Sequence, residues 1–190
     1  MNKPIIATIA LACAGLSSLC AEPVVYKIDT VHSGISFKIR HFINKIPGNF
    51  ADFTGEIHFD KESPENSKAV ATVQVKSVDT RNQKRDEHLQ NEDFFNSTVY
   101  PAMSFTSTKW EQTGDNQFAV TGDLTILNTT KPVTFAVSFL GEIEGRGAIR
   151  SGWEGKATIN RTDWGITNGA PAVGEEVEIE LNIQAHRTEA

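Results

Sequence analysis

Five histidines are the side chains of this chain that most readily suggest metal or acid–base chemistry: His32, His41, His58, His88 and His186. No two of them are spaced i, i+4, the spacing that lets one face of a helix bind zinc. They fall in different parts of the sequence, so His32 and His41 would meet only if the fold brought them together. We therefore expect no metal site and interpret the histidines as hydrogen-bonding groups near strand ends.

Two short clusters of charged residues could also act on a ligand. Arg85, Asp86 and His88 suggest an acid–base group, but residues one to three apart on a helix point in diverging directions. Their expected role is to tie a polar helix to its surroundings by charged hydrogen bonds; the alternative is contact with a ligand head group, where Arg85 would pair with phosphate. Arg161 and Asp163 are expected to form a buried ion pair in a bend, with ligand contact again the alternative.

Nucleophilic chemistry has little basis in the rest of the sequence. There is no nucleophilic serine motif and no glycine-rich phosphate loop, and Cys13 and Cys20 both lie near the N-terminus. We expect no catalytic residue and no cofactor. An enzyme is therefore the weaker class of function.

The N-terminal residues have the features of an export signal. Lys3 supplies a positive start, residues 5–19 are apolar, and small residues lead to Ala21. A lipoprotein signal at Cys20 is the weaker alternative, because Leu19 is bulkier than the residue such a site prefers. We predict a signal peptide over residues 1–21, cleavage after Ala21, and a single periplasmic domain over residues 22–190.

Charge and hydropathy restrict the partners of that domain. The formal net charge is −6, which argues against nucleic acid or an anionic membrane surface as the main partner. No stretch after the signal approaches the roughly 20 apolar residues of a membrane-spanning helix, so we expect no stable membrane insertion. A homodimer is left open.

Eight segments that alternate apolar and polar residues are expected to position the candidate groups. Strict alternation indicates half-buried antiparallel strands. The apolar faces comprise Ile35, Phe37 and Ile39; Phe53, Gly55, Ile57 and Phe59; Ala69, Ala71, Val73 and Val75; Met103 and Phe105; Phe118, Val120, Gly122, Leu124 and Ile126; Val133, Phe135, Val137 and Phe139; Ile149, Trp153, Gly155, Ala157 and Ile159; and Val177, Ile179, Leu181, Ile183 and Ala185. About eight such strands predict an all-β, eight-stranded antiparallel up-and-down barrel, whose interior is either filled by side chains or holds one small ligand.

Small residues on the inward face favour the second of these possibilities. Gly55, Gly122 and Ala157 occupy inward positions where bulky side chains would be expected, so we predict that they leave volume for a ligand. On this interpretation, phenylalanine in place of Gly122 or Ala157 reduces ligand occupancy while the fold survives. The alternative is an ordinary packed core.

The alternation stops between residues 79 and 95, where the sequence predicts a short helical insertion. Asp79 or Thr80 is the expected N-cap and Leu89 the main apolar anchor. A polar excursion of this length between barrel strands is typical of a lid or rim. We expect at least one of Phe94 and Phe95 to plug the barrel mouth.

Several strings of residues resemble the YceI-like family of secreted polyisoprenoid-binding proteins with a lipocalin-like barrel. Together they extend along nearly all of the chain after residue 21. They are Tyr26-Lys27-Ile28-Asp29 with His32-Ser33, Ile35, Phe37 and His41; Phe53-Thr54-Gly55; Arg85-Asp86-Glu87-His88-Leu89 with Phe94-Phe95, Pro101 and Phe105; Gly122-Asp123-Leu124-Thr125-Ile126 with Thr130-Lys131-Pro132-Val133; and 159–166. The resemblance implies an elongated apolar tunnel that holds an isoprenoid chain, with a quinone or polyprenyl phosphate head near the opening.

The alternation and the resemblance together select the candidate binding residues. The expected tunnel lining is Phe37, Ile39, Phe59, Val73, Phe94, Phe95, Met103, Phe105, Val120, Leu124, Phe135, Trp153, Ile159 and Trp164. The expected rim, near a head group, is His32, Arg85, Asp86, His88, Arg161 and Asp163.

Binding of a long-chain lipid for periplasmic transport or storage is the expected function. One alternative is a periplasmic enzyme acting on such a lipid, with His88, Asp86 or Asp163 as acid or base. The other is a stress-related interaction protein with a filled barrel.

Overall fold

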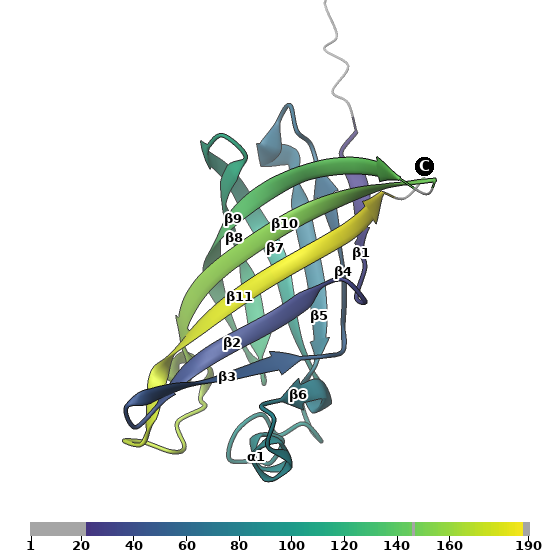
Figure 1. The fold of residues 1–190 in the computed structure, drawn as a ribbon. Helices are drawn as coiled ribbons and strands as arrows, with labels where there is room; N and C mark the ends of the chain where they lie inside the picture. Colours follow the sequence, from purple (N-terminus) through teal and green to yellow (C-terminus); the bar gives the residue numbers. More distant parts are fainter. Residues whose placement is uncertain (1–21, 146, 188–190) are drawn as a thin grey trace, which may run out of the picture.

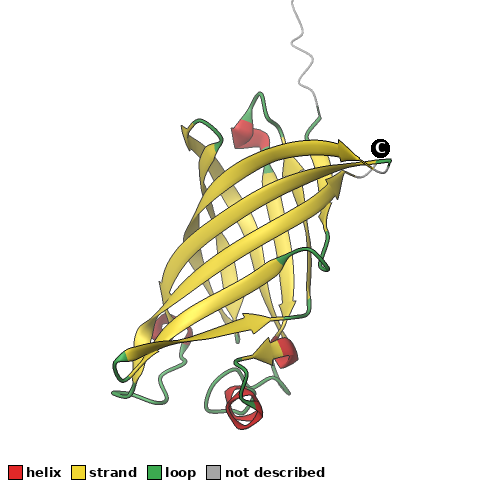
Figure 2. Ribbon diagram, viewed as in Figure 1, coloured by secondary structure: helices red, strands yellow, loops and turns green. Residues whose placement is uncertain are grey.

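The computed structural model describes residues 22–145 and 147–187, which form one barrel with a helix at its lower end (Figure 1). The expected signal peptide and its cleavage site, residues 1–21, lie outside the described residues. Strands account for most of the described chain, and the short helical segments lie at the ends of the barrel (Figure 2). The predicted fold class, an eight-stranded antiparallel barrel with a short helical insertion, is confirmed.

The barrel wall is a continuous sheet in which neighbouring strands are antiparallel. In chain order the strands are β1 (Val24–Ile28), β2 (Gly34–His41), β3 (Asn44–Phe50), β4 (Phe53–Phe59), β5 (Lys68–Gln74), β6 (Val78–Asp79), β7 (Ala102–Gly114), β8 (Gln117–Ile126), β9 (Thr129–Gly145), β10 (Ala148–Asn160) and β11 (Val173–Arg187). The sheet closes because β11 pairs with β1 as well as with β10 and β2.

The first segments of the chain explain how eleven strands make an eight-stranded barrel. β1 pairs with residues 185–187 of β11, and β2 pairs with residues 173–182 of the same strand. β1 and β2 therefore act as one long strand interrupted at residues 29–33. On their other side β4 pairs with β1 and β3 pairs with β2, so β3 and β4 form a second interrupted strand. β5 in turn pairs with β4 and β6 pairs with β3, so β5 and β6 form a third, which leaves eight strands around the barrel.

Asp29 links this interruption to β11. Its Oδ2 lies 2.7 Å from His32 Nδ1, 2.8 Å from His186 Nε2 and 3.1 Å from Gln184 Nε2, while Oδ1 accepts a 3.0 Å hydrogen bond from the Val31 amide. The hydrogen bond from His32, followed by those from His186 and Val31, holds the pKa of Asp29 well below its ordinary value. The ionised carboxylate thus ties the break between β1 and β2 to the strand that closes the barrel.

Aromatic rings fill the upper half of the barrel, away from the helix. The Phe59 ring centroid lies 4.8 Å from that of Trp153, 5.2 Å from that of Phe139, 5.7 Å from that of Phe118 and 6.1 Å from that of Trp110. All five side chains are buried. The rings pack edge to face or tilted against one another, the arrangements that aromatic pairs prefer.

The helical insertion begins later than the sequence predicted. Helix α1 (Gln83–Leu89) is capped by Asn82, whose side chain accepts a 3.1 Å hydrogen bond from the Arg85 amide. Asp79 belongs instead to β6, and Thr80 is a hydrogen-bond partner of the helix rather than its cap. The predicted N-cap was therefore wrong, because Asp79 still takes part in the sheet. Turns, not helix, follow at residues 90–95.

Gly122 makes room for a neighbouring ring rather than for a ligand. A Cβ added there would lie 2.5 Å from both the Phe105 Cζ and the backbone oxygen of Thr106. A phenylalanine at this position would have to displace both groups, so Gly122 is a poor position for blocking the cavity. Ala157 packs against the lower core and is not among the residues that line the cavity described below, so it is a poor position for blocking it.

We expect Gly122→Ala to lower the free energy of unfolding by about 1–3 kcal/mol, because its Cβ must displace strand backbone. Gly34→Ala is the matched control, since nothing lies within 4 Å of its added Cβ. That variant should be unchanged or slightly more stable. Urea unfolding of both variants checks the expectation, and equal stabilities would show that the Phe105 ring and the Thr106 backbone shift freely.

We expect Asp29→Asn to destabilise the protein in a pH-dependent way. Because the pKa of Asp29 is lowered in the folded state, its contribution is present above the unfolded value of about 3.9 and is lost as the pH falls further. The difference in unfolding free energy between wild type and variant should therefore be larger at pH 5 than at pH 3. Asp115→Asn, in the exposed β7–β8 turn, is the control, and equal pH profiles for the two variants would contradict the role of Asp29.

Candidate ligand-binding cavity

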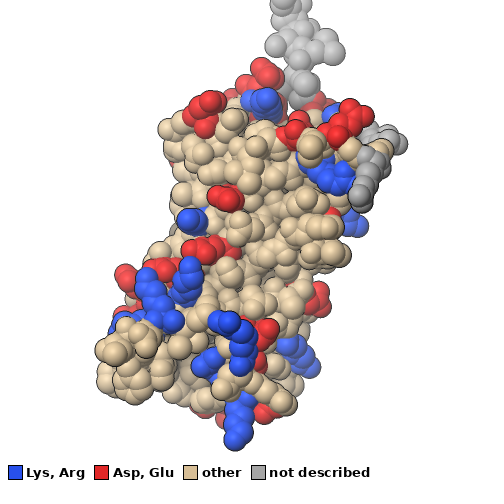
Figure 3. All heavy atoms as spheres, viewed as in Figure 1, with Lys and Arg blue, Asp and Glu red and all other residues tan. Residues whose placement is uncertain are grey.

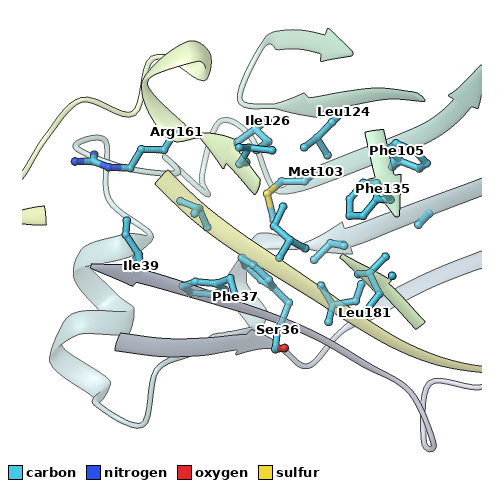
Figure 4. A pocket seen from close by; sticks show the side chains of 18 of the residues that line it. Ser36, Phe37, Ile39, Met103, Phe105, Leu124, Ile126, Phe135, Arg161 and Leu181 are labelled. Atoms are coloured by element: carbon cyan, nitrogen blue, oxygen red, sulfur yellow. The ribbon is translucent and has the colours of Figure 1, made fainter. Parts of the chain in front are cut away.

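A cavity of about 580 Å³ occupies the lower half of the barrel, between the aromatic cluster and α1. Its walls are almost wholly apolar. Figure 4 shows Arg161 and Ile39 at one end of the cavity and Phe105, Phe135 and Leu181 toward the other. Of the expected lining, the structure places on the cavity Phe37, Ile39, Val73, Phe94, Phe95, Met103, Phe105, Val120, Leu124, Phe135, Trp153 and Ile159.

Phe59 and Trp164, which were also expected to line the tunnel, do not reach it. Phe59 is enclosed by the rings of the upper cluster. Trp164 follows β10 in the short helical turn η3 (Arg161–Trp164), is buried behind the wall, and donates a 3.1 Å hydrogen bond to the Leu124 backbone oxygen. Phe59 points inward as the alternation requires, but the neighbouring rings lie between it and the cavity.

The upper end of the cavity is closed by two indole rings. Trp110 and Trp153 both line the cavity and belong to the aromatic cluster. Their Nε1 groups donate to Ser107 Oγ at 3.2 Å and to Ser151 Oγ at 3.0 Å. Because these polar atoms already have partners, the rings present only apolar surface to a ligand. A chain that enters the cavity must therefore enter from the end near α1.

The segment that covers the lower end contributes three apolar side chains. Leu89 at the end of α1, Phe94 and Phe95 all line the cavity. The turn after the helix brings both rings to the same side, since the Phe95 amide donates to the Leu89 carbonyl at 3.0 Å. The Phe94 ring lies 5.0 Å from the His88 ring, and the Phe95 ring lies 6.0 Å from the Phe50 ring.

Arg161 holds the loop opposite α1, residues 165–172, against the barrel. Its guanidinium donates to four backbone carbonyls: Nε to Gly174 at 2.8 Å, Nη1 to Ile166 and Asn168 at 2.7 Å each, and Nη2 to Val173 at 3.1 Å. Burial lowers the pKa of this guanidinium. The expected ion pair with Asp163 is absent, because that side chain is exposed and Arg161 uses its donors on the loop.

The other expected rim residues divide between the cavity and the scaffold. Arg85 and His88 line the cavity. Arg85 Nε donates to Thr80 Oγ1 at 2.7 Å. Asp86 Oδ1 accepts from the same hydroxyl and from the Thr80 amide, so Asp86 bonds the segment before α1 and does not line the cavity. His32 is bound to Asp29 at the barrel seam and does not line the cavity.

Sequence reasoning missed one side of the opening. His41, Ile46, Asn168, Ala172 and Val173 line the cavity near this end but were not proposed as site residues. The signal that could have found the loop is its composition, since residues 164–174 carry no charge next to a strand rich in glutamate.

The polar groups around the opening are arranged for structure more than for acid–base catalysis. His88 lies 3.4 Å from Asp93, and both side chains are largely exposed. Among the described residues there is no cluster of three or more metal-ligating side chains. No helix within the same residues is long and apolar enough to cross a membrane. The almost wholly apolar lining suits the site to enclosing an apolar chain.

We expect Arg161→Lys to loosen the loop opposite α1, because one ammonium group cannot replace a guanidinium that reaches four carbonyls. Losing hydrogen bonds to a charged donor should lower the free energy of unfolding by at least about 2 kcal/mol. Hydrogen exchange should accelerate at residues 165–174 and stay unchanged in the upper strands. Arg81→Lys is the exposed control, and matching exchange profiles would show that the loop does not depend on Arg161.

Comparisons of the sequence and of the structure with known proteins agree with one another. A family model described as a YceI-like domain matches residues 26–185. A UPF0312 protein of Ectopseudomonas mendocina is 36% identical over 193 residues, covering 98% of this chain and 100% of that protein. The crystal structure of BcnA from Burkholderia cenocepacia matches with a TM-score of 0.77 and 25% identity, over 83% of this chain and 99% of that one. A polyisoprenoid binding domain from Saccharophagus degradans has the same fold, with a TM-score of 0.69 at 12% identity, over 87% of this chain and 99% of that one.

Proposed function

This chain belongs to the YceI-like domain family, and we propose that it binds the hydrocarbon chain of a lipid inside its barrel, with a polyisoprenoid of the quinone or polyprenyl phosphate type as the ligand class. The observation that carries the proposal is the apolar cavity of about 580 Å³, closed by indole rings at one end and bordered by polar groups at the other. The domain from Saccharophagus degradans, described as polyisoprenoid binding, supports the choice of ligand class.

The physical basis of binding is the removal of apolar surface from water. Each Å² buried contributes about 25 cal/mol, so a long hydrocarbon chain needs few polar contacts. A head group left near the opening would meet Arg85 and His88, whereas Arg161 has its donors occupied by the loop. The cavity selects by shape and apolarity more than by charge.

A catalytic function has less support. Of the side chains proposed as acid or base, Asp86 accepts hydrogen bonds from Thr80 and Asp163 is exposed outside the cavity. His88 lines the cavity, but its nearest acidic partner, Asp93, is itself largely exposed. Carriage or storage of the lipid in the periplasm is therefore the role we propose.

Blocking the cavity tests the proposal. Ala71→Phe projects a ring from a lining position, whereas Ala136→Phe places the same ring on the exposed outer face. Organic extraction and mass spectrometry of each protein, purified from its native compartment, should find lipid in the wild type and in Ala136→Phe but little in Ala71→Phe. Equal lipid content in two well-folded variants would place the ligand outside the cavity.

The proposed periplasmic location depends on the N-terminal signal. We expect the exported protein to begin at Glu22 and to contain no cysteine, because both cysteines precede that residue. N-terminal sequencing and intact-mass measurement of the periplasmic fraction check this. A mature protein that begins at Cys20 with an attached diacylglycerol would contradict it.

A further inference from the structure

The turn between β2 and β3 lies at the lower end of the barrel (Figure 1) and carries two exposed apolar residues. Phe42 is 64% exposed and Ile43 is 91% exposed. Single exposed apolar residues are common on protein surfaces, but an adjacent aromatic and aliphatic pair at a protruding turn is the kind of feature that marks a contact site.

The turn is held firmly in this exposed position. Phe42 has a left-handed backbone with a φ of 51°, which is unusual for a bulky residue. Its amide donates to the Ala172 carbonyl at 2.7 Å, and its carbonyl accepts from Arg40 Nη1 at 2.6 Å. These bonds fix the turn to the neighbouring loop, so the two side chains do not depend on a partner for their placement.

The residues of the turn and of the loop beside it are uncharged, and the Arg40 guanidinium that bonds the Phe42 carbonyl lies at their border. We call residues 41–44 and 164–174 the hairpin end; it contains no aspartate, glutamate, lysine or arginine. Figure 3 shows this part of the surface as a tan bulge at the lower left, with both basic and acidic side chains above it. Two of the lysines behind the turn, Lys38 and Lys45, pair with Glu180 and Glu178, so each of these positive charges is matched by a carboxylate.

The hairpin end also forms one side of the cavity opening. His41, Asn168, Ala172 and Val173 belong to it and line the cavity. Whatever contacts Phe42 and Ile43 therefore lies directly at the entrance. This continuity connects the exposed pair to the ligand site.

We propose that the hairpin end dips reversibly into the interfacial layer of a lipid bilayer, so that the cavity opens toward lipid rather than water. The inference rests on the proposed function, because a hydrocarbon ligand is supplied and received by membranes. Two projecting side chains offer far less area than the roughly 1,200 Å² of a stable protein interface, which disfavours a protein partner or a second copy. Uncharged residues at the tip and lysine–glutamate pairs behind it suit a neutral lipid surface.

Vesicle binding tests the inference with a matched pair of variants. The first is Phe42→Ser with Ile43→Ser; the control is Leu140→Ser with Ile143→Ser, which are 62% and 69% exposed on β9, outside the hairpin end. Phosphatidylcholine vesicles should sediment the wild type and the control equally. The hairpin variant should bind at least about tenfold more weakly and take up vesicle-borne ubiquinone correspondingly more slowly.

Binding of geraniol, dispersed in water without vesicles, separates this inference from the proposed function. All three proteins should bind geraniol equally, because none of the four substituted residues lines the cavity. Failure of the wild type to bind it would count against the proposed function. Normal geraniol binding, with equal vesicle binding by both variants, would overturn the bilayer contact, as would self-association of the wild type lost only in the hairpin variant. Ile43→Ser alone repeats the test if the double variant unfolds.

Discussion

Closure of the sheet on β11 is the constraint on which the cavity depends. One strand must pair with β10 along one side and with both β1 and β2 along the other, which places the break between β1 and β2 in the barrel wall. Asp29 bridges that break through His32 and His186. The interior of an eight-stranded barrel is just wide enough for side chains to fill it. Large aromatic rings occupy its upper end, and the cavity lies at the lower end.

Polar side chains near the cavity mainly satisfy backbone groups that the strands leave unpaired. Arg161 donates to two carbonyls of the loop and to two at the start of β11, and Thr80 accepts from Arg85 and donates to Asp86. A buried carbonyl without a partner costs free energy, so an arginine in this role stabilises an irregular wall beside an apolar space. The opening is therefore built from backbone fixed by a few charged groups, and its shape is set before any ligand arrives.

The two-residue alternation predicted most of the barrel strands. It failed where the structure depends on the depth of a side chain or on contacts between distant residues. The two-residue repeat identifies which face of a strand points inward, but not how deep a residue lies, so Phe59 was assigned to the tunnel although other rings enclose it. β3 was missed because Pro47 and Gly48 interrupt its pattern, and Gly48 lies against the Phe37 ring. His32 was assigned to the rim, whereas it lies at the seam beside Asp29. The contact of Asp29 with His186 on β11 marks the seam, and local spacing does not contain that long-range relation. The glycines on the inward face were interpreted as empty volume, whereas Gly122 accommodates Phe105.

The arrangement of the cavity and the hairpin end bears on rate more than on affinity. A hydrocarbon chain is surrounded by apolar groups both in a bilayer and in this cavity, so the two environments differ little in the hydrophobic free energy that each provides. The large free-energy cost arises during transfer between the two environments, when the hydrocarbon chain is exposed to water. Because the upper end is closed and the opening lies beside Phe42 and Ile43, the path of the chain through water is shortest at that opening. For a lipid carrier built this way, the exposed turn would govern how quickly lipid is exchanged, and the ring-lined interior would govern which lipid is held.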